Sequence, residues 1–174
     1  MPDVTIRPAA AHDIAAITRI YAHAVRYGTA SFEIEPPDEA EMAQRQRALL
    51  GASYPYLVAV VEGAVAGYGY AGPYRARPGY RWTVEDSVYV APDAHRRGIG
   101  RALLKALIAE AERLGFRQMI AVVGDSGNTA SIELHRALGF ATIGAFVSVG
   151  FKHGRWLDSV LMQRPLGRGD SAAP

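Results

Sequence analysis

One segment constrains the fold more than the rest of the chain: a short apolar strand, a turn rich in arginine and glycine, and a helix that begins at the glycines. It runs from Asp86 to Leu104, and its turn reads Arg96-Arg97-Gly98-Ile99-Gly100-Arg101. A turn of this kind presents consecutive backbone N–H groups at a helix N-terminus, where the helix macrodipole also favours negative charge. The segment therefore predicts a site for a phosphate-bearing ligand. The alternative is an ordinary strand-to-helix turn with solvated arginines.

Two common phosphate-binding loops are excluded by the residues at the start of this helix. A P-loop requires Gly-Lys-Ser/Thr after its glycines, whereas Gly100 is followed by Arg101 and Ala102. A dinucleotide-binding loop requires a small residue three positions after its second glycine, and that position is Leu103. The turn therefore belongs to another class of phosphate-binding loop.

Composition excludes several classes of protein. The chain has 174 residues, a net charge of +2 and no cysteine. We therefore expect one domain with a real core, no nucleic-acid partner, and no disulfide, cysteine-based zinc site or thiol nucleophile. The histidines show no metal-ligand spacing, so no metal is expected. The longest apolar run, residues 56–61, ends at Glu62 and is too short to span a membrane. Without a basic and apolar leader, the sequence predicts a soluble cytoplasmic protein with no membrane partner.

Hydrophobic periodicity and turn residues predict the element order βααβββαβαββ. Expected helices cover residues 11–26, 38–50, 98–114 and 128–138, and expected strands cover residues 4–7, 56–62, 65–70, 84–90, 119–123, 143–149 and 156–162. Asp38 is expected to cap the second helix. The order predicts a single α/β domain over residues 1–166, with a mixed central sheet flanked by helices. Residues 167–174 contain few apolar side chains and are expected to form a disordered tail.

The strand of valine and tyrosine followed by the Gly-x-Gly turn resembles the pyrophosphate loop of the GNAT acetyltransferases, whose fold has the same element order. Segments 71–85, 134–140 and 150–158 resemble the phosphinothricin and methionine sulfoximine acetyltransferases of that superfamily. The likeness covers residues 4–166, with a departure at His95, where the family's loop usually begins with Gln or Arg. It implies the GNAT fold, acetyl-CoA as co-substrate and no metal. It also implies cofactor contacts from Val88, Tyr89, Val90, Arg96, Arg97, Gly98, Ile99, Gly100, Arg101 and Asn128.

The reaction implied by this resemblance is transfer of acetyl to the α-amine of a small amino-acid analogue such as phosphinothricin, methionine sulfoximine or methionine sulfone. The amine is mostly protonated at neutral pH, so direct attack on the thioester needs a general base, acting alone or through one water. Glu85 matches the family's proposed base; the alternative is a carboxylate paired with a loop arginine such as Arg81. His135 occupies the position of a tyrosine that protonates the leaving thiolate in many GNAT enzymes; the alternative is a histidine packed against Phe140. Asn128 is an N-cap, a contact to the pantetheine arm, or both.

An amino-acid acceptor also requires a site for its carboxylate. Arg75 and Arg77 lie on a loop bounded by proline and glycine, and guanidinium groups suit bidentate carboxylate binding. Solvated surface arginines are the alternative. Thr29 and Phe32 are expected to approach the same pocket. The residues expected to bind the acceptor are Arg75, Ala76, Arg77, Glu85, Asp86 and Ser87.

Partners and competing functions follow from the same resemblance. Relatives are commonly homodimers, which implies a homodimer here, with a small amino-acid-like molecule as substrate. Two other functions stay open at this point. One is acetylation of a protein or peptide N-terminus, and the other is a non-catalytic acyl-CoA-binding module.

Overall fold

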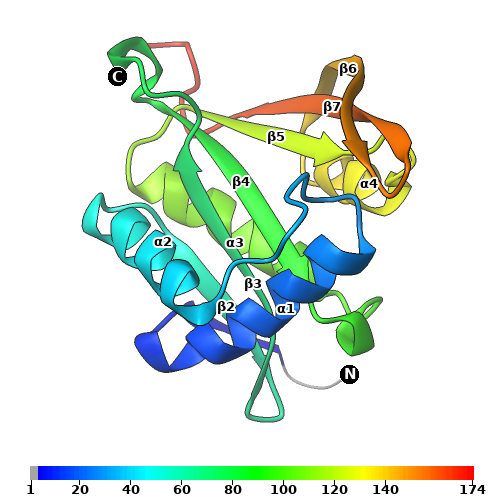
Figure 1. Ribbon diagram of the computed structural model, residues 1–174. Helices are drawn as coiled ribbons and strands as arrows, with labels where there is room; N and C mark the ends of the chain where they lie inside the picture. Colours follow the sequence, from blue (N-terminus) through cyan, green and yellow to red (C-terminus); the bar gives the residue numbers. More distant parts are fainter. Residues whose placement is uncertain (1–3) are drawn as a thin grey trace.

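Side chains along β2 (Tyr56–Val61) alternate between two hydrophobic cores, and this alternation organises the molecule into layers. The computed structural model describes residues 4–174. Tyr56 and Val58 pack in one core with the apolar face of α1 (Ile14–Tyr27). Leu57 and Ala59 pack in another core with α3 (Ile99–Arg113). A strand buried on both faces reads as a continuous apolar run, and the sheet therefore lies between two layers of helices (Figure 1).

The strands form one seven-stranded mixed sheet in the order β1-β2-β3-β4-β5-β7-β6. Helices α1 and α2 (Glu39–Gly51) cover one face, and α3 and α4 (Thr129–Ala137) cover the other. The remaining strands are β1 (Val4–Pro8), β3 (Ala64–Pro73), β4 (Thr83–Val90), β5 (Gln118–Gly124), β6 (Ala141–Lys152) and β7 (Arg155–Pro165). Short 3-10 turns lie at Ala11–Asp13, Pro78–Tyr80 and Pro92–Ala94. The predicted element order and mixed sheet are confirmed.

β4 and β5 pair in parallel only over their first residues. Their register ends at Glu85 opposite Ile120. Beyond that point β4 stays paired with β3 as far as Val90, and β5 stays paired with β7 as far as Gly124. The two halves of the sheet therefore diverge past this point, as Figure 1 shows, and the C-terminal halves of β4 and β5 are not paired with each other.

The strands β3, β6 and β7 are each longer than the sequence pattern predicts by four or more residues, because antiparallel pairing continues past the apolar residues. β3 reaches Pro73, which pairs with Val84 of β4. β6 and β7 form a hairpin of 12 and 11 residues, with register shifts along β6. The predicted cap of α2 is confirmed, since Asp38 Oδ1 accepts from the Glu41 backbone N–H at 2.8 Å.

At the end of the chain, the Arg117 side chain donates to the Ala173 carbonyl oxygen at 3.0 Å, and the expected disorder of residues 167–174 stays a prediction. Across residues 4–174, none of the helices has the length and apolar character that a membrane crossing requires.

Candidate active site

The opening between β4 and β5 is a cleft of about 1170 Å³. Its walls come from the C-terminal halves of these strands, the α1–α2 connection, the turn before α3 and the start of α4. The structure brings nearly all predicted cofactor residues together there: Val88, Tyr89, Val90, Arg96, Gly98, Ile99, Gly100, Arg101 and Asn128. Glu85, Asp86, Ser87 and His135 line the same cleft, whereas Arg97 is not among its lining residues.

The turn before α3 has the backbone geometry of an anion site. Arg96 and Gly98 both have left-handed backbone angles, with φ of +61° and +77°. Gly98 is the N-cap of α3 and has no side chain to cap it. The first-turn N–H groups of the helix are therefore left for a ligand, and the helix dipole favours an anionic one. A diphosphate fits these donors.

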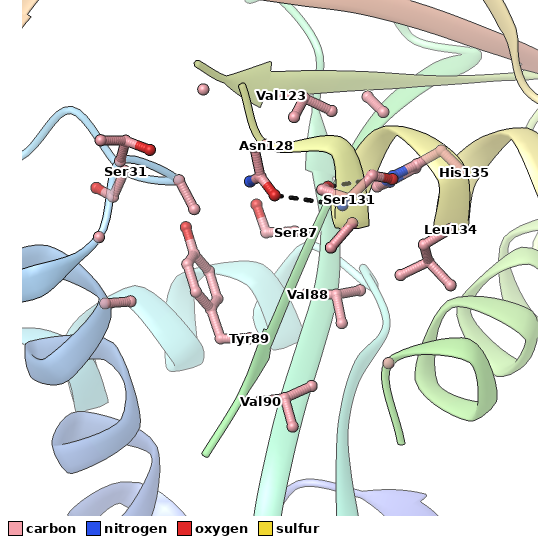
Figure 2. Close-up of a pocket in the computed structure, with 18 of the residues that line it drawn as sticks. Ser31, Ser87, Val88, Tyr89, Val90, Val123, Asn128, Ser131, Leu134 and His135 are labelled. Atoms are coloured by element: carbon pink, nitrogen blue, oxygen red, sulfur yellow. Dashed lines mark hydrogen bonds between the residues drawn. The ribbon is translucent and has the colours of Figure 1, made fainter. Parts of the chain in front are cut away.

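Asn128 has the structural role predicted for it. Its side-chain oxygen accepts from the Ser131 backbone N–H at 3.3 Å and caps α4. Figure 2 shows this contact at the edge of the cleft. The cap uses the acceptor of the amide and leaves its NH2 group to donate elsewhere, so capping and a cofactor contact are compatible.

Glu85 lies at the point where β4 parts from β5 and lines the cleft. Burial raises the pKa of Glu85 above its ordinary value, and the neighbouring Asp86 carboxylate raises it further. A carboxylate with a raised pKa is better matched to accepting a proton near neutral pH. Arg81, the alternative partner, places its guanidinium over the Trp82 ring at 5.4 Å.

His135 is held at both ring nitrogens. Nδ1 lies 2.7 Å from the Ser131 carbonyl oxygen, and Nε2 lies 3.1 Å from Asp86 Oδ2. Both oxygens can accept a hydrogen bond, and an imidazolium, which has an N–H at each ring nitrogen, satisfies both contacts. Burial lowers the pKa of His135, but the hydrogen bond and charge of Asp86, together with the hydrogen bond to the Ser131 carbonyl group, outweigh burial and leave the pKa raised. The ring also packs edge-on against Phe140 at 5.0 Å.

The position of His135 is consistent with both the catalytic and the structural interpretation of this residue. The residue lines the cleft, as a catalytic residue should, and it packs against Phe140, as the structural alternative expects. Its two N–H groups are engaged within the protein, so donation to a thiolate requires one of them to leave its partner. The proton-donor role of His135 therefore stays a prediction.

The predicted acceptor arginines lie outside the cleft lining. Arg75 is exposed and lies over the Tyr74 and Tyr80 rings, at 5.1 and 5.6 Å from their centroids. Arg77 and Ala76 are exposed on the same loop. This loop joins β3 to β4, and its three residues do not line the cleft that Glu85 lines. Their role in binding stays a prediction.

Sequence reasoning missed some contributors to the cleft, including Ser31, Gly124 and Ser131. A Cβ on Gly124 would lie 2.3 Å from the Thr29 carbonyl oxygen. Only the tertiary contact between the α1–α2 connection and the end of β5 explains this glycine. Thr29 and Phe32 both line the cleft, and their approach to the acceptor stays a prediction.

Comparison with known proteins shows the family of this chain. The profile of the acetyltransferase (GNAT) family matches residues 17–140. The chain belongs to the GNAT acetyltransferase family. A phosphinothricin N-acetyltransferase of Alcaligenes faecalis is 58% identical over 98% of this chain and 86% of its own length. An L-methionine sulfoximine/L-methionine sulfone acetyltransferase of Salmonella typhimurium is 45% identical over 98% of each chain.

A solved structure gives the same result for the GNAT fold. The phosphinothricin acetyltransferase of Sinorhizobium meliloti, a GNAT protein in complex with AcCoA, superposes with a TM-score of 0.96 at 52% identity, covering 98% of this chain and 92% of the other. The predicted family, fold and acetyl-CoA co-substrate are thereby confirmed. Within residues 4–174, no group of three or more His, Cys, Asp or Glu side chains is arranged to hold a metal ion.

Proposed function

We propose that this GNAT enzyme moves acetyl from acetyl-CoA to the α-amine of a small amino-acid analogue of the phosphinothricin or methionine sulfoximine type. One observation carries the proposal: the half-buried Glu85 carboxylate lies in the same cleft as the uncapped start of α3. A phosphate-binding helix end and a base with a raised pKa are the two groups that acetyl transfer to an amine requires. The named relatives support the choice of acceptor.

The co-substrate is assigned to the turn before α3 and the divergent strands. Backbone N–H groups from Gly98 to Arg101 bind the diphosphate, and the Arg96 and Arg101 side chains flank it. Arg97 does not line the cleft, so its assignment to the phosphates rests on its place in the turn between Arg96 and Gly98. The pantetheine arm follows Val88–Val90 toward Asn128, which places the thioester near Glu85.

The chemistry assigned to Glu85 is removal of a proton from the acceptor's ammonium group, directly or through one water. The neutral nitrogen then forms a C–N bond with the acetyl carbonyl carbon, and the C–S bond to coenzyme A breaks. The nitrogen then loses its second proton and the leaving thiolate takes up a proton, which gives the N-acetyl product and free coenzyme A. General-base catalysis of this kind contributes about 10²- to 10⁴-fold in rate.

His135 is assigned an electrostatic role in the same step. Its imidazolium, fixed by Asp86 and Ser131, places a positive charge beside the cleft in which thiolate charge develops. A fixed charge of this kind stabilises a developing anion without reorganisation. Protonation of the thiolate by His135 requires one N–H group to leave its partner; where Nε2 leaves Asp86, Asp86 takes part as well.

Acceptor binding is assigned to Asp86, Ser87 and Glu85 inside the cleft, with Arg75, Ala76 and Arg77 closing on the acceptor carboxylate from outside. We also propose a cytoplasmic homodimer. Support for the dimer is the outer strand β6, where large apolar side chains stay exposed: Ile143, Phe146, Val147, Val149 and Phe151. An exposed apolar edge strand of this length favours pairing with a second copy.

A thiol-release assay with acetyl-CoA tests the proposed function. The acceptors are phosphinothricin, methionine sulfoximine, methionine sulfone and a set of peptides with free N-termini. We expect turnover with the amino-acid analogues and a loss of about 10²-fold or more in kcat for Glu85→Ala, with little change in the KM for acetyl-CoA. Preference for peptides would replace the acceptor assignment. Coenzyme A binding without thiol release from any amine would indicate a non-catalytic module.

A further inference from the structure

The hairpin sequence Gly150-Phe151-Lys152-His153-Gly154 has no part in the chemistry described so far. Lys152 ends β6, a strand whose other side chains are largely exposed, yet Lys152 itself is only 4% exposed. Its Nζ donates to the Ser31 carbonyl oxygen at 2.7 Å, across 121 residues of chain. A buried ammonium group is costly unless it is hydrogen-bonded, and burial lowers the pKa of Lys152 while the Glu33 carboxylate partly restores it. The hydrogen bond to Ser31 therefore compensates the burial of the ammonium group and holds β6 against the segment that contains Ser31.

A second contact from the same hairpin reaches the start of the α1–α2 connection. His153 Nε2 donates to the Gly28 carbonyl oxygen at 3.2 Å. Lys152 and His153 thus bind carbonyl groups near both ends of the segment Gly28–Phe32. All five residues of this segment line the cleft, and we call the segment the acceptor wall.

Two glycines bring the acceptor wall into close contact with the sheet. A Cβ on Gly150 would lie 2.4 Å from the Phe32 ring, and a Cβ on Gly124 would lie 2.3 Å from the Thr29 carbonyl oxygen. Real Cβ atoms do not approach so closely, so each contact requires glycine or a shifted wall. The hairpin and the end of β5 therefore fix the wall both by hydrogen bonds and by shape.

The side chain of Ser31 is bound from the helical layer. Its Oγ lies 2.9 Å from the Tyr21 hydroxyl and accepts from the Glu33 backbone N–H at 3.2 Å. Arg45 of α2 binds the Glu33 carboxylate at 2.6 Å. Ser31 is therefore held from the helices by its side chain and from the hairpin by its carbonyl group. Figure 2 shows it across the cleft from Asn128 and Ser131.

We infer that the Lys152 hairpin is a positioning device for the acceptor: it fixes the acceptor wall opposite α4 and so sets the affinity for the amino-acid substrate. This inference rests on the proposed function. It assigns Lys152 and His153 no contact with the reacting atoms. The turn before α3, which is assigned to the co-substrate, has no contact with the Lys152 hairpin among those described. Changes in the hairpin should therefore alter the KM for the acceptor and not the KM for acetyl-CoA.

Lys152→Met is the direct test, because methionine fills a similar volume without the ammonium group. We expect the KM for methionine sulfoximine to rise about tenfold or more, the size of a lost charged hydrogen bond, while the KM for acetyl-CoA stays within about twofold. Gly150→Ala, which displaces Phe32 instead, should give the same split. Lys105→Met, on the exposed face of α3, is the matched control and should leave both constants unchanged.

Each outcome decides the inference. Equal rises in both KM values, or an unchanged KM for the acceptor in both hairpin variants, would overturn it. If circular dichroism shows that Lys152→Met is unfolded, Gly150→Ala and His153→Ala decide, with the same split expected. If the wild-type enzyme acetylates no amino-acid amine, the proposed function fails separately. The effect of the Lys152 hairpin on the acceptor wall is then measured by hydrogen exchange. Lys152→Met should accelerate amide exchange at residues 29–33 and leave exchange in α3 unchanged.

Discussion

Asp86→Asn isolates the charge in the buried contact between β4 and α4. The side chains of Asp86 and His135 are 2% and 7% exposed, and their hydrogen bond is 3.1 Å long. Asparagine keeps the shape and an acceptor oxygen toward His135 while it removes the charge; its NH2 group takes the place of Oδ1, which is buried without a hydrogen-bond partner among residues 4–174. A hydrogen bond to a charged group contributes about 1.5–3 kcal/mol. We expect the free energy of unfolding to fall by about this amount at pH 6.

The pH dependence of this loss follows from the raised pKa of His135. A group whose pKa is raised by folding contributes stability that is complete below its unfolded pKa, about 6.5 for histidine. That contribution is lost as the pH rises through the folded value. In Asp86→Asn the interaction that outweighs burial is weakened, so the pKa of His135 falls. The difference between wild type and variant should therefore be largest below about pH 6.5 and shrink above the folded pKa.

Urea unfolding followed by circular dichroism between pH 5.5 and 8.5 measures this difference. Asp93→Asn, at an exposed position in the turn before α3, is the matched control and should show no pH-dependent loss. A difference that is constant across the range would mean that Asp86 acts through packing and not through the charge of His135. Greater stability of the variant at pH 6 would refute the imidazolium assignment.

Three further results are expected. The acid limb of the kcat–pH profile should follow the raised pKa of Glu85, so kcat falls as the pH drops through that value. Glu85→Gln should lack this limb. An unchanged limb in the variant would assign it to another group. Gly98→Ala places a side chain at a φ of +77°, which costs about 1–2 kcal/mol, and calorimetry should show weaker binding of acetyl-CoA, whereas an unchanged Kd would remove this turn from the site. Gly124→Ala introduces the contact with the Thr29 carbonyl oxygen and should destabilise the protein by about 1–3 kcal/mol in urea unfolding, while Gly51→Ala, with open space around it, should not.

The fold was predictable because local signals and topology agree. The apolar run at residues 56–61, the Gly-x-Gly turn and the capping residue Asp38 each specify an element or its boundary from neighbouring residues alone. The family resemblance added the cofactor, and the cleft gathers nearly all residues that it implied. The hydrophobic pattern of the sequence could not predict the lengths of β3 and β6, because these depend on pairing with neighbouring strands.

The details of the site depend on contacts between residues far apart in sequence. Nothing near Asp86 indicates that it meets His135, 49 residues away, and nothing near Lys152 indicates Ser31. The arginines at positions 75 and 77 illustrate the opposite difficulty. Their side-chain chemistry suggested a carboxylate site, but their side chains lie exposed on the loop between β3 and β4 and do not line the cleft.

The separation of β4 from β5 leaves an interior edge in the middle of the sheet. Past Glu85, the backbone of β4 on the side facing β5 has N–H and C=O groups that the neighbouring strand does not pair with. An extended molecule bearing amide groups of its own can add there as a strand would, with backbone hydrogen bonds that ignore side-chain identity. Variation in the side chains of this stretch should therefore be tolerated by the co-substrate, provided that the two halves of the sheet keep their divergence.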